Sequence, residues 1–285
     1  MGIFVFRHFL APRALFCFRC VTILLMKKLV VANWKMNPAT AREAIALAKG
    51  VARAKGAEVV VCPPFLYLQA VSSHLKAQSS KPKAVLGVQD CFYEQKGAYT
   101  GEVSPAMLKN IGVKYVIIGH SERRALGETD DIIAKKVSAA LRAGLTPILC
   151  VGEPLSVRKK GIAASKKFVA TQLRKDLSLI RHSPFTIHHS PIIAYEPVWS
   201  ISTNKGAKPD SPENATEMIA FIKHHSPFTI HHSPTRVLYG GSVNPKNAHG
   251  FLSRKEIDGA LVGGASLNVR AFATIINISA QQSQK

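Results

Sequence analysis

Eight short apolar segments recur along the chain, separated by longer stretches in which apolar residues follow helical spacing. The expected strands are Leu29–Ala32, Glu58–Cys62, Ala84–Val88, Tyr115–Ile118, Pro147–Val151, Ile192–Tyr195, Arg236–Tyr239 and Gly259–Val262. Their near-continuous apolar character is typical of strands that are covered on both faces. Eight such strands in alternation with helices predict an α/β protein whose parallel sheet has right-handed crossover connections.

The expected helices are Thr40–Lys55, Phe65–Ala77, Asp130–Ala143, Val157–Ile180, Pro212–His224 and Leu267–Asn277. An open doubly wound sheet and a closed (β/α)8 barrel both satisfy this alternation. The closed barrel fits the number of strands and the 285 residues without leaving edge strands, so we predict a parallel eight-stranded barrel with outer helices. No GxGxxG motif follows the first strand, which disfavours a dinucleotide-binding site.

The composition is that of a globular protein, with 47% hydrophobic and 19% charged residues, and excludes wholesale disorder, a collagen-like repeat and a coiled coil. The 38 Lys and Arg exceed the 17 Asp and Glu, which gives a net charge of +21. Such a charge attracts nucleic acid, acidic lipid or phosphorylated metabolites. Because the basic residues are dispersed, we expect a solvated surface and no nucleic-acid partner. Five scattered cysteines favour a reducing, cytoplasmic compartment.

Residues 1–25 differ from the rest because they contain no Asp or Glu and their apolar runs are broken by Arg7, Arg13 and Arg19. These interruptions argue against a transmembrane helix, and no clean apolar stretch marks a signal peptide. A transit peptide and a membrane-associated form are alternatives to the favoured interpretation, an upstream extension of a chain that starts at Met26. We expect this extension, one barrel domain at 26–280, and a tail at 281–285. No membrane partner is expected.

The decapeptide HSPFTIHHSP occurs at 182–191 and again at 225–234. Its histidines raise the possibility of metal binding, but its prolines exclude helices and central strands. Each copy directly precedes an expected strand. We therefore predict two inserted surface loops at the N-terminal end of the barrel, where they affect stability rather than catalysis, and no metal site. The Cys17 and Cys20 pair has no partner motif and is also expected to bind no metal.

Side chains capable of chemistry follow five of the expected strands. They include Asn33 and Lys35 after the first strand, His120, Ser121 and Glu122 after the fourth, Glu196 after the sixth, and glycine-rich turns at 240–242 and 263–266 after the seventh and eighth. The carboxyl ends of barrel strands meet at one rim, where catalysis takes place. Glycine-rich turns supply N–H groups for a phosphate, and a carboxylate with an imidazole suits proton transfer at carbon. Together they predict an active site for a phosphorylated substrate.

The motifs NWKMN, GHSERR, AYEPVW, YGGSV and LVGGASL, in this order, resemble those of the triosephosphate isomerase family. The resemblance runs from about Met26 to Ile278. It implies a TIM barrel, usually a homodimer without cofactor, that interconverts dihydroxyacetone phosphate and D-glyceraldehyde 3-phosphate in glycolysis and gluconeogenesis. The segment GAYTGE at 97–102 resembles the family's subunit-contact loop, in which Thr100 enters the partner's site. Another phosphate-binding barrel, such as a sugar-phosphate isomerase or a biosynthetic lyase, is the alternative enzyme.

The resemblance also implies residue roles. Glu196 is expected to be the base that moves a proton between neighbouring carbons, and His120, as a neutral imidazole, to polarise the carbonyl group. Lys35 is expected to offset substrate charge, and Asn33 to orient the substrate and Lys35. Glu122 and Ser121 are expected to contact and position these catalytic side chains rather than the substrate. The expected phosphate-binding N–H groups belong to Ser202, Ser242, Gly263 and Gly264.

The chain departs from the family pattern between Pro197 and the following helix. The family usually reads EPVWAIGTGK, whereas this chain reads EPVWSISTNKGAKPDSPENA. Ser202 and Asn204 replace glycines, and the stretch before Ser211 is longer. A backbone N–H group can bind phosphate from any residue type, so we expect the chemistry to survive and the kinetics of the loop that covers the substrate to change.

Overall fold

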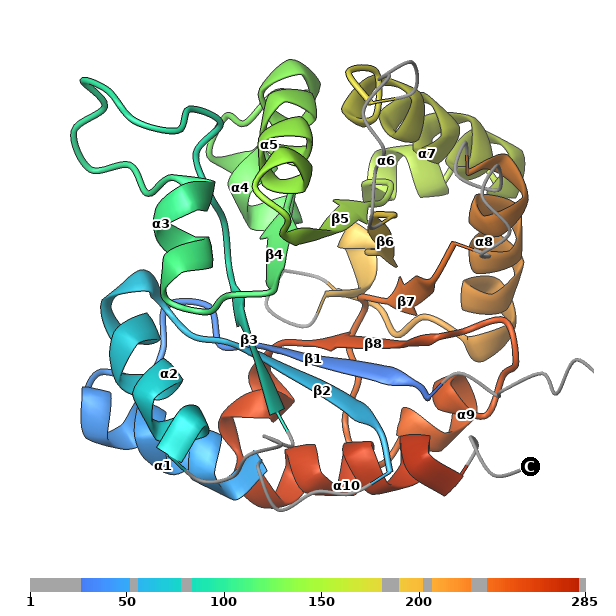
Figure 1. Cartoon of the computed structure of the whole chain (residues 1–285). Coiled ribbons are helices and arrows are strands. Elements are labelled where there is room, and N and C mark those ends of the chain that lie inside the picture. The colour runs from blue at the N-terminus through green and yellow to red at the C-terminus, as the bar shows by residue number, and fades with distance from the viewer. Residues whose placement is uncertain are drawn as a thin grey trace, which may run out of the picture.

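The eight apolar segments form eight parallel strands that are hydrogen-bonded in chain order, with helices outside them (Figure 1). The computed structural model of the chain describes residues 27–51, 56–77, 84–180, 190–201, 207–226 and 235–281. The strands are β1 (Leu29–Asn33), β2 (Glu58–Cys62), β3 (Ala84–Val88), β4 (Tyr115–Ile118), β5 (Thr146–Val151), β6 (Ile192–Tyr195), β7 (Val237–Tyr239) and β8 (Gly259–Val262).

The last strand pairs with the first, which closes the sheet and confirms the barrel over the open alternative. Leu29 is the register partner of Gly259, and three further pairs continue the β1–β8 ladder to Ala32 and Val262. A Cβ atom at Gly259 would lie 1.8 Å from the carbonyl oxygen of Leu29. The two backbones therefore approach too closely for any side chain, and glycine is required where the barrel closes.

Strand residues alternate between two apolar layers, as the period of two in a strand requires. One cluster fills the barrel interior and consists of Leu29, Val31, Val60, Cys62, Ile117, Ile148, Cys150, Ile192, Ala194, Leu238 and Leu261. The residues between them, such as Val30, Ala32, Val59 and Val61, belong to a larger cluster that includes the inner faces of the helices. Because both faces are buried, the strands read as continuous apolar runs in the sequence.

The helical elements surround the strands (Figure 1). They are α1 (Ala41–Val51), η1 (Phe65–Tyr67), α2 (Leu68–Ala77), α3 (Pro105–Asn110), α4 (Ser121–Ala125), α5 (Asp130–Arg142), α6 (Leu155–Arg158), α7 (Ile162–Asp176), η2 (Val198–Ser200), α8 (Pro212–His225), α9 (Ala248–Leu252), η4 (Gly264–Leu267) and α10 (Val269–Gln281). Ser211 caps α8, because its hydroxyl accepts the Asn214 N–H at 3.2 Å. Gly144 follows α5 with a left-handed φ of 72°.

Two features of the helices differ from the prediction. The expected helix Val157–Ile180 is divided into α6 and α7, because Gly161 between them adopts a left-handed φ of 96°, which no helix continues through. The short helices α3, α4 and α9 were not expected at all, since five or six residues are too few to show helical periodicity.

The expected extension at 1–25, most of both decapeptides and residues 282–285 lie outside the described residues. Ser226, the second residue of the second decapeptide, and Thr235, which follows the decapeptide, have buried hydroxyl groups that are hydrogen-bonded to each other at 2.9 Å. Within the described ranges, no helix is long and apolar enough to cross a membrane, and no group of histidine, cysteine and acidic side chains could hold a metal ion.

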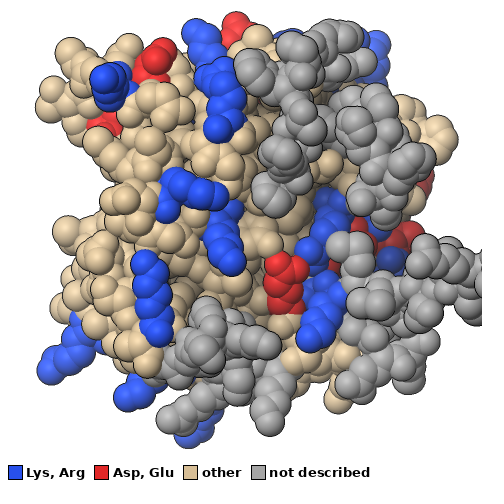
Figure 2. Space-filling model, in the orientation of Figure 1, with Lys and Arg blue, Asp and Glu red and all other residues tan. Residues whose placement is uncertain are grey.

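Basic side chains are scattered over the face of the molecule drawn in Figure 2. Lys and Arg occur there singly and in small groups with tan surface between the groups, rather than forming one continuous patch. This arrangement agrees with the dispersed basic residues of the sequence.

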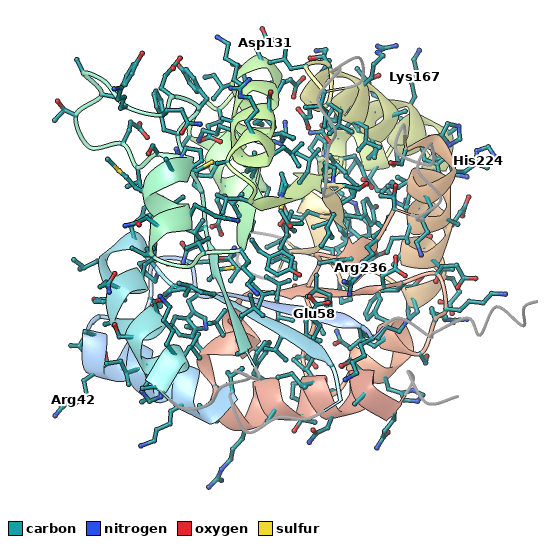
Figure 3. All side chains as sticks on the ribbon, viewed as in Figure 1. Arg42, Glu58, Asp131, Lys167, His224 and Arg236 are labelled. Atoms are coloured by element: carbon teal, nitrogen blue, oxygen red, sulfur yellow. The ribbon has the colours of Figure 1, made fainter. Side chains whose placement is uncertain are left out.

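A polar group occupies the N-terminal end of the barrel. Figure 3 labels Glu58 at the start of β2 and Arg236 before β7, and their side chains form an ion pair of 2.8 Å. The Tyr115 hydroxyl donates a hydrogen bond of 2.5 Å to the other Glu58 oxygen. Burial opposes ionisation of Glu58, but the hydrogen bonds from Tyr115 and Arg236 outweigh burial and lower its pKa. Paired polar side chains therefore occupy the N-terminal end of the barrel.

Arg124 joins four elements through its guanidinium group. Its Nη2 lies 2.6 Å from Asp176 at the end of α7 and 3.0 Å from the carbonyl of Cys150 in β5. Its Nη1 contacts Asp130 of α5 at 2.8 Å, and its Nε donates to the carbonyl of Gly119 after β4. Asp176 is completely buried. Arg124 is thus the main source of positive charge for a carboxylate that water does not reach.

We predict that Arg124→Met lowers the free energy of unfolding by about 3–5 kcal/mol, because the variant leaves Asp176 buried without a cation. Arg270→Met is the control, since Arg270 is exposed on α10, and we expect a change below about 0.5 kcal/mol. Urea denaturation followed by circular dichroism measures both. Equal effects of the two substitutions would contradict the assignment.

Candidate active site

One cavity opens at the carboxyl ends of the strands, and it is lined by seven of the predicted site residues: Asn33, Lys35, His120, Glu196, Ser242, Gly263 and Gly264. Its volume is about 160 Å³, below the range of about 300–1,000 Å³ typical of drug-sized ligands, so it suits a small molecule. The lining residues are Asn33, Lys35, His120, Glu196, Ile201, Gly240, Gly241, Ser242, Val243, Asn244, Leu261, Gly263, Gly264 and Ala265. The structure therefore brings together side chains that are up to 232 positions apart, from Asn33 to Ala265.

Glu196 places a buried carboxylate beside this cavity. Its backbone extends β6, because its N–H donates to the carbonyl of Val151 at 2.8 Å. The residue is 2% exposed, and its Oε2 accepts the Ser121 N–H at 3.0 Å. Its Oε1 lies 3.1 Å from His120 Nε2, but this contact lacks hydrogen-bond geometry and Oε1 has no hydrogen-bond partner. A buried carboxylate oxygen without a partner can accept a proton from a substrate.

Two glycines provide the space that Glu196 occupies. A Cβ atom at Gly152 would lie 1.7 Å from the Glu196 carbonyl oxygen, and one at Gly240 would lie 2.7 Å from Glu196 Cγ. Beneath the site, burial and the nearby Glu196 carboxylate raise the pKa of the Cys150 thiol well above its usual range, which keeps this neighbour neutral. The Cys150 thiol therefore stays protonated and does not take up the proton that Glu196 removes from a substrate.

His120 follows β4 and begins α4. Its Nδ1 accepts the backbone N–H of Glu122 at 3.2 Å, so Nδ1 carries no proton. The imidazole is then neutral, with its single proton on Nε2, the nitrogen that faces Glu196 and the cavity. In this form the ring can donate a hydrogen bond to a substrate oxygen without bringing a full charge into the site.

Lys35 is the only described non-glycine residue with a positive φ, at 53°. This conformation is held by the side chain of Asn33, which accepts the Lys35 N–H at 3.0 Å, and by Gln89, which donates to the Lys35 carbonyl at 2.8 Å. The strained turn directs the side chain toward the mouth, where Nζ lies 2.6 Å from Glu122. Glu122 also lies 3.7 Å from His120 Nδ1, so one carboxylate contacts both the lysine and the histidine.

The glycine-rich turns after β7 and β8 also line the cavity. Gly240, Gly241 and Ser242 belong to the first turn, and Gly263 and Gly264 to the second. Ser242 donates its hydroxyl to the carbonyl of Ser200 at 2.8 Å, which ties this turn to the segment after β6. The predicted Ser202 lies outside the described residues.

Thr100 does not line the cavity of its own chain. It belongs to the segment 89–104 between β3 and α3, which projects from the body of the molecule at the upper left of Figure 1. Tyr99 in this segment and Met107 in α3 are 43% and 58% exposed. An exposed projection of this kind is suited to contact another molecule.

The sequence did not indicate a buried network beneath the segment after β6. Glu153 is completely buried, and its carboxylate accepts hydrogen bonds from Tyr195 at 3.1 Å and from Trp199 Nε1 at 3.0 Å. The Arg158 guanidinium lies 5.2 Å from the Trp199 ring and 4.0 Å from the Glu153 carboxylate. The available signal was the pair Glu153-Pro154 after β5, which matches the strand-end position of Glu196-Pro197.

Comparison with known proteins agrees with this geometry. The sequence profile of the family described as triosephosphate isomerase matches residues 28–279. The triosephosphate isomerase of Caldanaerobacter subterraneus subsp. tengcongensis is 44% identical over 258 residues, 88% of this chain and 99% of the relative. That of Aquifex aeolicus is 42% identical over 257 residues, again 88% and 99%. A crystal structure of the Bartonella henselae enzyme superimposes with a TM-score of 0.74 at 37% identity, covering 89% and 99% of the two chains.

We predict that His120 is a neutral imidazole with its proton on Nε2, because Nδ1 is occupied as an acceptor. Nitrogen-15 NMR of histidine-labelled protein at pH 7 distinguishes this tautomer from the imidazolium and from the Nδ1–H form. The His120 signals are assigned by their absence in His120→Gln. Detection of two protonated ring nitrogens would contradict the prediction.

Proposed function

The chain belongs to the triosephosphate isomerase family, and from this premise we propose that it interconverts dihydroxyacetone phosphate and D-glyceraldehyde 3-phosphate, as an intramolecular isomerase of glycolysis and gluconeogenesis. The observation that carries the proposal is the convergence of Lys35, His120 and Glu196 on one small cavity with two glycine-rich turns. Another phosphate-binding barrel would require the turns but not these three side chains together.

Glu196 is assigned as the base. Its unpartnered Oε1 removes a proton from the carbon next to the carbonyl group, and the bonding electrons move to the carbonyl oxygen to give an enediolate. The same carboxyl group then returns the proton to the neighbouring carbon. His120 Nε2–H polarises the carbonyl oxygen in the first step and exchanges protons between the two substrate oxygens. The transfer stays within one substrate, so no cofactor is required.

Lys35 offsets the negative charge of the phosphoester and of the enediolate, because its ammonium group lines the same cavity. Asn33 orients the substrate and supports the strained backbone of Lys35 through its 3.0 Å hydrogen bond. Glu122 fixes the position of Lys35 Nζ at 2.6 Å, and the Ser121 N–H holds one oxygen of Glu196. These two residues act on the catalytic side chains and not on the substrate.

The phosphate is assigned to backbone N–H groups of Ser202, Ser242, Gly263 and Gly264. Ser242, Gly263 and Gly264 line the cavity, and no side chain at either glycine obstructs an approaching ligand. Gly264 has no atom within 4 Å of its hypothetical Cβ position, so the turn is open toward the cavity. Such backbone nests bind anions without a positively charged side chain.

We also propose a cytoplasmic homodimer, formed by one barrel domain per chain, with no nucleic-acid or membrane partner. The projecting segment 89–104 supports the dimer, as does Met36, which is 95% exposed beside the site. A hollow in the projection is bordered by Phe92, Tyr99 and Met107 and could accept an apolar side chain of a second copy. The described cysteines Cys62, Cys91 and Cys150 are free and buried, in agreement with a reducing compartment.

We expect the wild-type protein to convert dihydroxyacetone phosphate in an assay that measures the NADH formed when a coupling dehydrogenase oxidises the D-glyceraldehyde 3-phosphate product with NAD⁺. Glu196→Asp withdraws the carboxylate by one methylene group, about 1 Å, and is expected to lower kcat by roughly 10²-fold. The control is Glu217→Asp, which shortens an exposed carboxylate on α8 and should leave kcat unchanged. A Glu196→Asp variant with full turnover would falsify the assignment of the base.

Thr100→Arg tests the homodimer. The added cation at the tip of the projection is expected to prevent association, so sedimentation should change from twice the chain mass of 30.9 kDa to one chain mass. Activity should fall at the same time, because Thr100 is expected to enter the partner's site. Leu179→Arg introduces the same charge at an apolar residue that is 52% exposed after α7, and should leave both unchanged. Wild-type sedimentation as a single chain would contradict the proposal.

A further inference from the structure

Three buried polar atoms near the glycine-rich turn after β7 have no hydrogen-bond partner. They are the Tyr239 hydroxyl, the Ser200 hydroxyl and Oδ2 of Asp210. Tyr239 is fully buried and Ser200 is 3% exposed. Buried polar atoms are nearly always paired in native proteins, so a group of three at one place requires an explanation.

These atoms lie directly behind the cavity wall that is proposed to bind phosphate. A Cβ atom at Gly241 would lie 2.2 Å from the Tyr239 hydroxyl oxygen, so this hydroxyl is pressed against the turn. The Ser200 carbonyl accepts the Ser242 hydroxyl at 2.8 Å, which connects the end of η2 to the same turn. Asp210 precedes α8, and its Oδ1 accepts the Ser211 N–H at 2.9 Å. One oxygen of Asp210 is therefore fixed by the backbone, and the carboxylate also faces the side chains of Tyr239 and Asn214.

The electrostatic character of the three groups is complementary. Tyr239 interacts with both Asp210 and Ser200. Burial raises the pKa of Asp210 to about 6, partly offset by the Ser211 N–H, Arg158 of α6 and Tyr239. Burial also raises the pKa of Tyr239 above its usual range, and Asp210 acts on Tyr195 of β6 in the same direction. At neutral pH Asp210 is thus an ionised acceptor facing hydroxyl donors.

We propose that Asp210 is a positioning residue for phosphate recognition: its second carboxylate oxygen accepts the Tyr239 hydroxyl, which lies against Gly241, and thereby holds the turn 240–242 in place for a phosphoester in the cavity. The inference rests on the proposed function, because it assumes a phosphorylated ligand at this wall. Asp210 lies in the stretch before Ser211 that is longer than the family pattern, so this support belongs to the present chain.

The test compares Asp210→Ala and Asp210→Asn with wild type. Loss of a hydrogen bond to a charged group corresponds to roughly a tenfold change in binding. We expect Asp210→Ala to raise KM for dihydroxyacetone phosphate and the inhibition constant of inorganic phosphate by about tenfold, with kcat nearly unchanged. The control is Glu213→Gln, which removes a carboxylate that is 69% exposed on the first turn of α8 and should leave both constants at their wild-type values.

A pH series distinguishes positioning from a general structural role. Asp210 becomes protonated as the pH falls through about 6, so it loses its acceptor character there. The ratio of kcat/KM between wild type and Asp210→Asn should fall from about ten at pH 8 toward one at pH 5. The substrate phosphate also titrates near pH 6, but it affects both proteins equally and cancels in the ratio.

Unchanged constants in both Asp210 variants, or a ratio that is constant with pH, would overturn the inference, as would an equal effect of Glu213→Gln. Thermal melting shows whether each variant is folded, and Asp210→Asn, which keeps the size of the side chain, replaces Asp210→Ala if the latter does not fold. Calorimetric binding of inorganic phosphate to the full chain separates the two proposals. If wild type binds phosphate but does not isomerise the triose, the proposed function fails, while the phosphate affinities of the variants still decide the role of Asp210.

Discussion

The hydrogen-bonded seam between β1 and β8 is the constraint on which the rest of the structure depends. It aligns the carboxyl ends of all eight strands on one rim, so that groups from the first, fourth, sixth, seventh and eighth strands face one cavity. The seam also brings Lys35 against the last turn, because a Cβ atom at Gly263 would lie 3.2 Å from Lys35 Cε. In an open sheet β1 and β8 would not be neighbours, and the lysine would not share a wall with the turns.

Buried charged side chains form ion pairs with oppositely charged residues in the barrel wall, but the buried carboxylate at the mouth does not. Away from the mouth, buried ions are paired: Lys136 contacts Asp90 at 2.7 Å and Glu128 at 2.5 Å, and Arg124 contacts Asp176 at 2.6 Å. At the mouth, Glu196 retains an oxygen without a hydrogen bond although the residue is 2% exposed. Unsatisfied polar groups persist where the surrounding structure holds them in place, and they concentrate at functional sites. Asp176 Oδ1 and Glu128 Oε2 in the wall also lack a hydrogen bond, but the second oxygen of each carboxylate is held by a cation, whereas neither oxygen of Glu196 contacts a lysine or arginine among the described residues.

Most of the barrel and the main site could be predicted from the sequence for a physical reason. Strands buried on both faces have no polar positions, so segments such as Val30–Ala32 are recognisable without any partner, and the order of strands determines which residues share the rim. The division at Gly161 and the short helices depend on local backbone conformation, which periodicity does not report. Glu153 and Asp210 were missed because an acidic residue in a loop is normally solvated, and only the packing of distant elements buries these two.

Lys35 shows that the demands of folding and of chemistry conflict at one position. A non-glycine residue at φ 53° is less stable than glycine in that conformation by about 1 kcal/mol or more. Glycine there would relax the backbone but remove the ammonium group. Random mutagenesis selected only for thermal resistance should therefore enrich glycine at position 35, whereas selection for growth on a carbon source that needs the enzyme should retain lysine. The backbone conformation of Lys35 therefore lowers the stability of the protein, while the lysine that adopts it is required for the proposed activity.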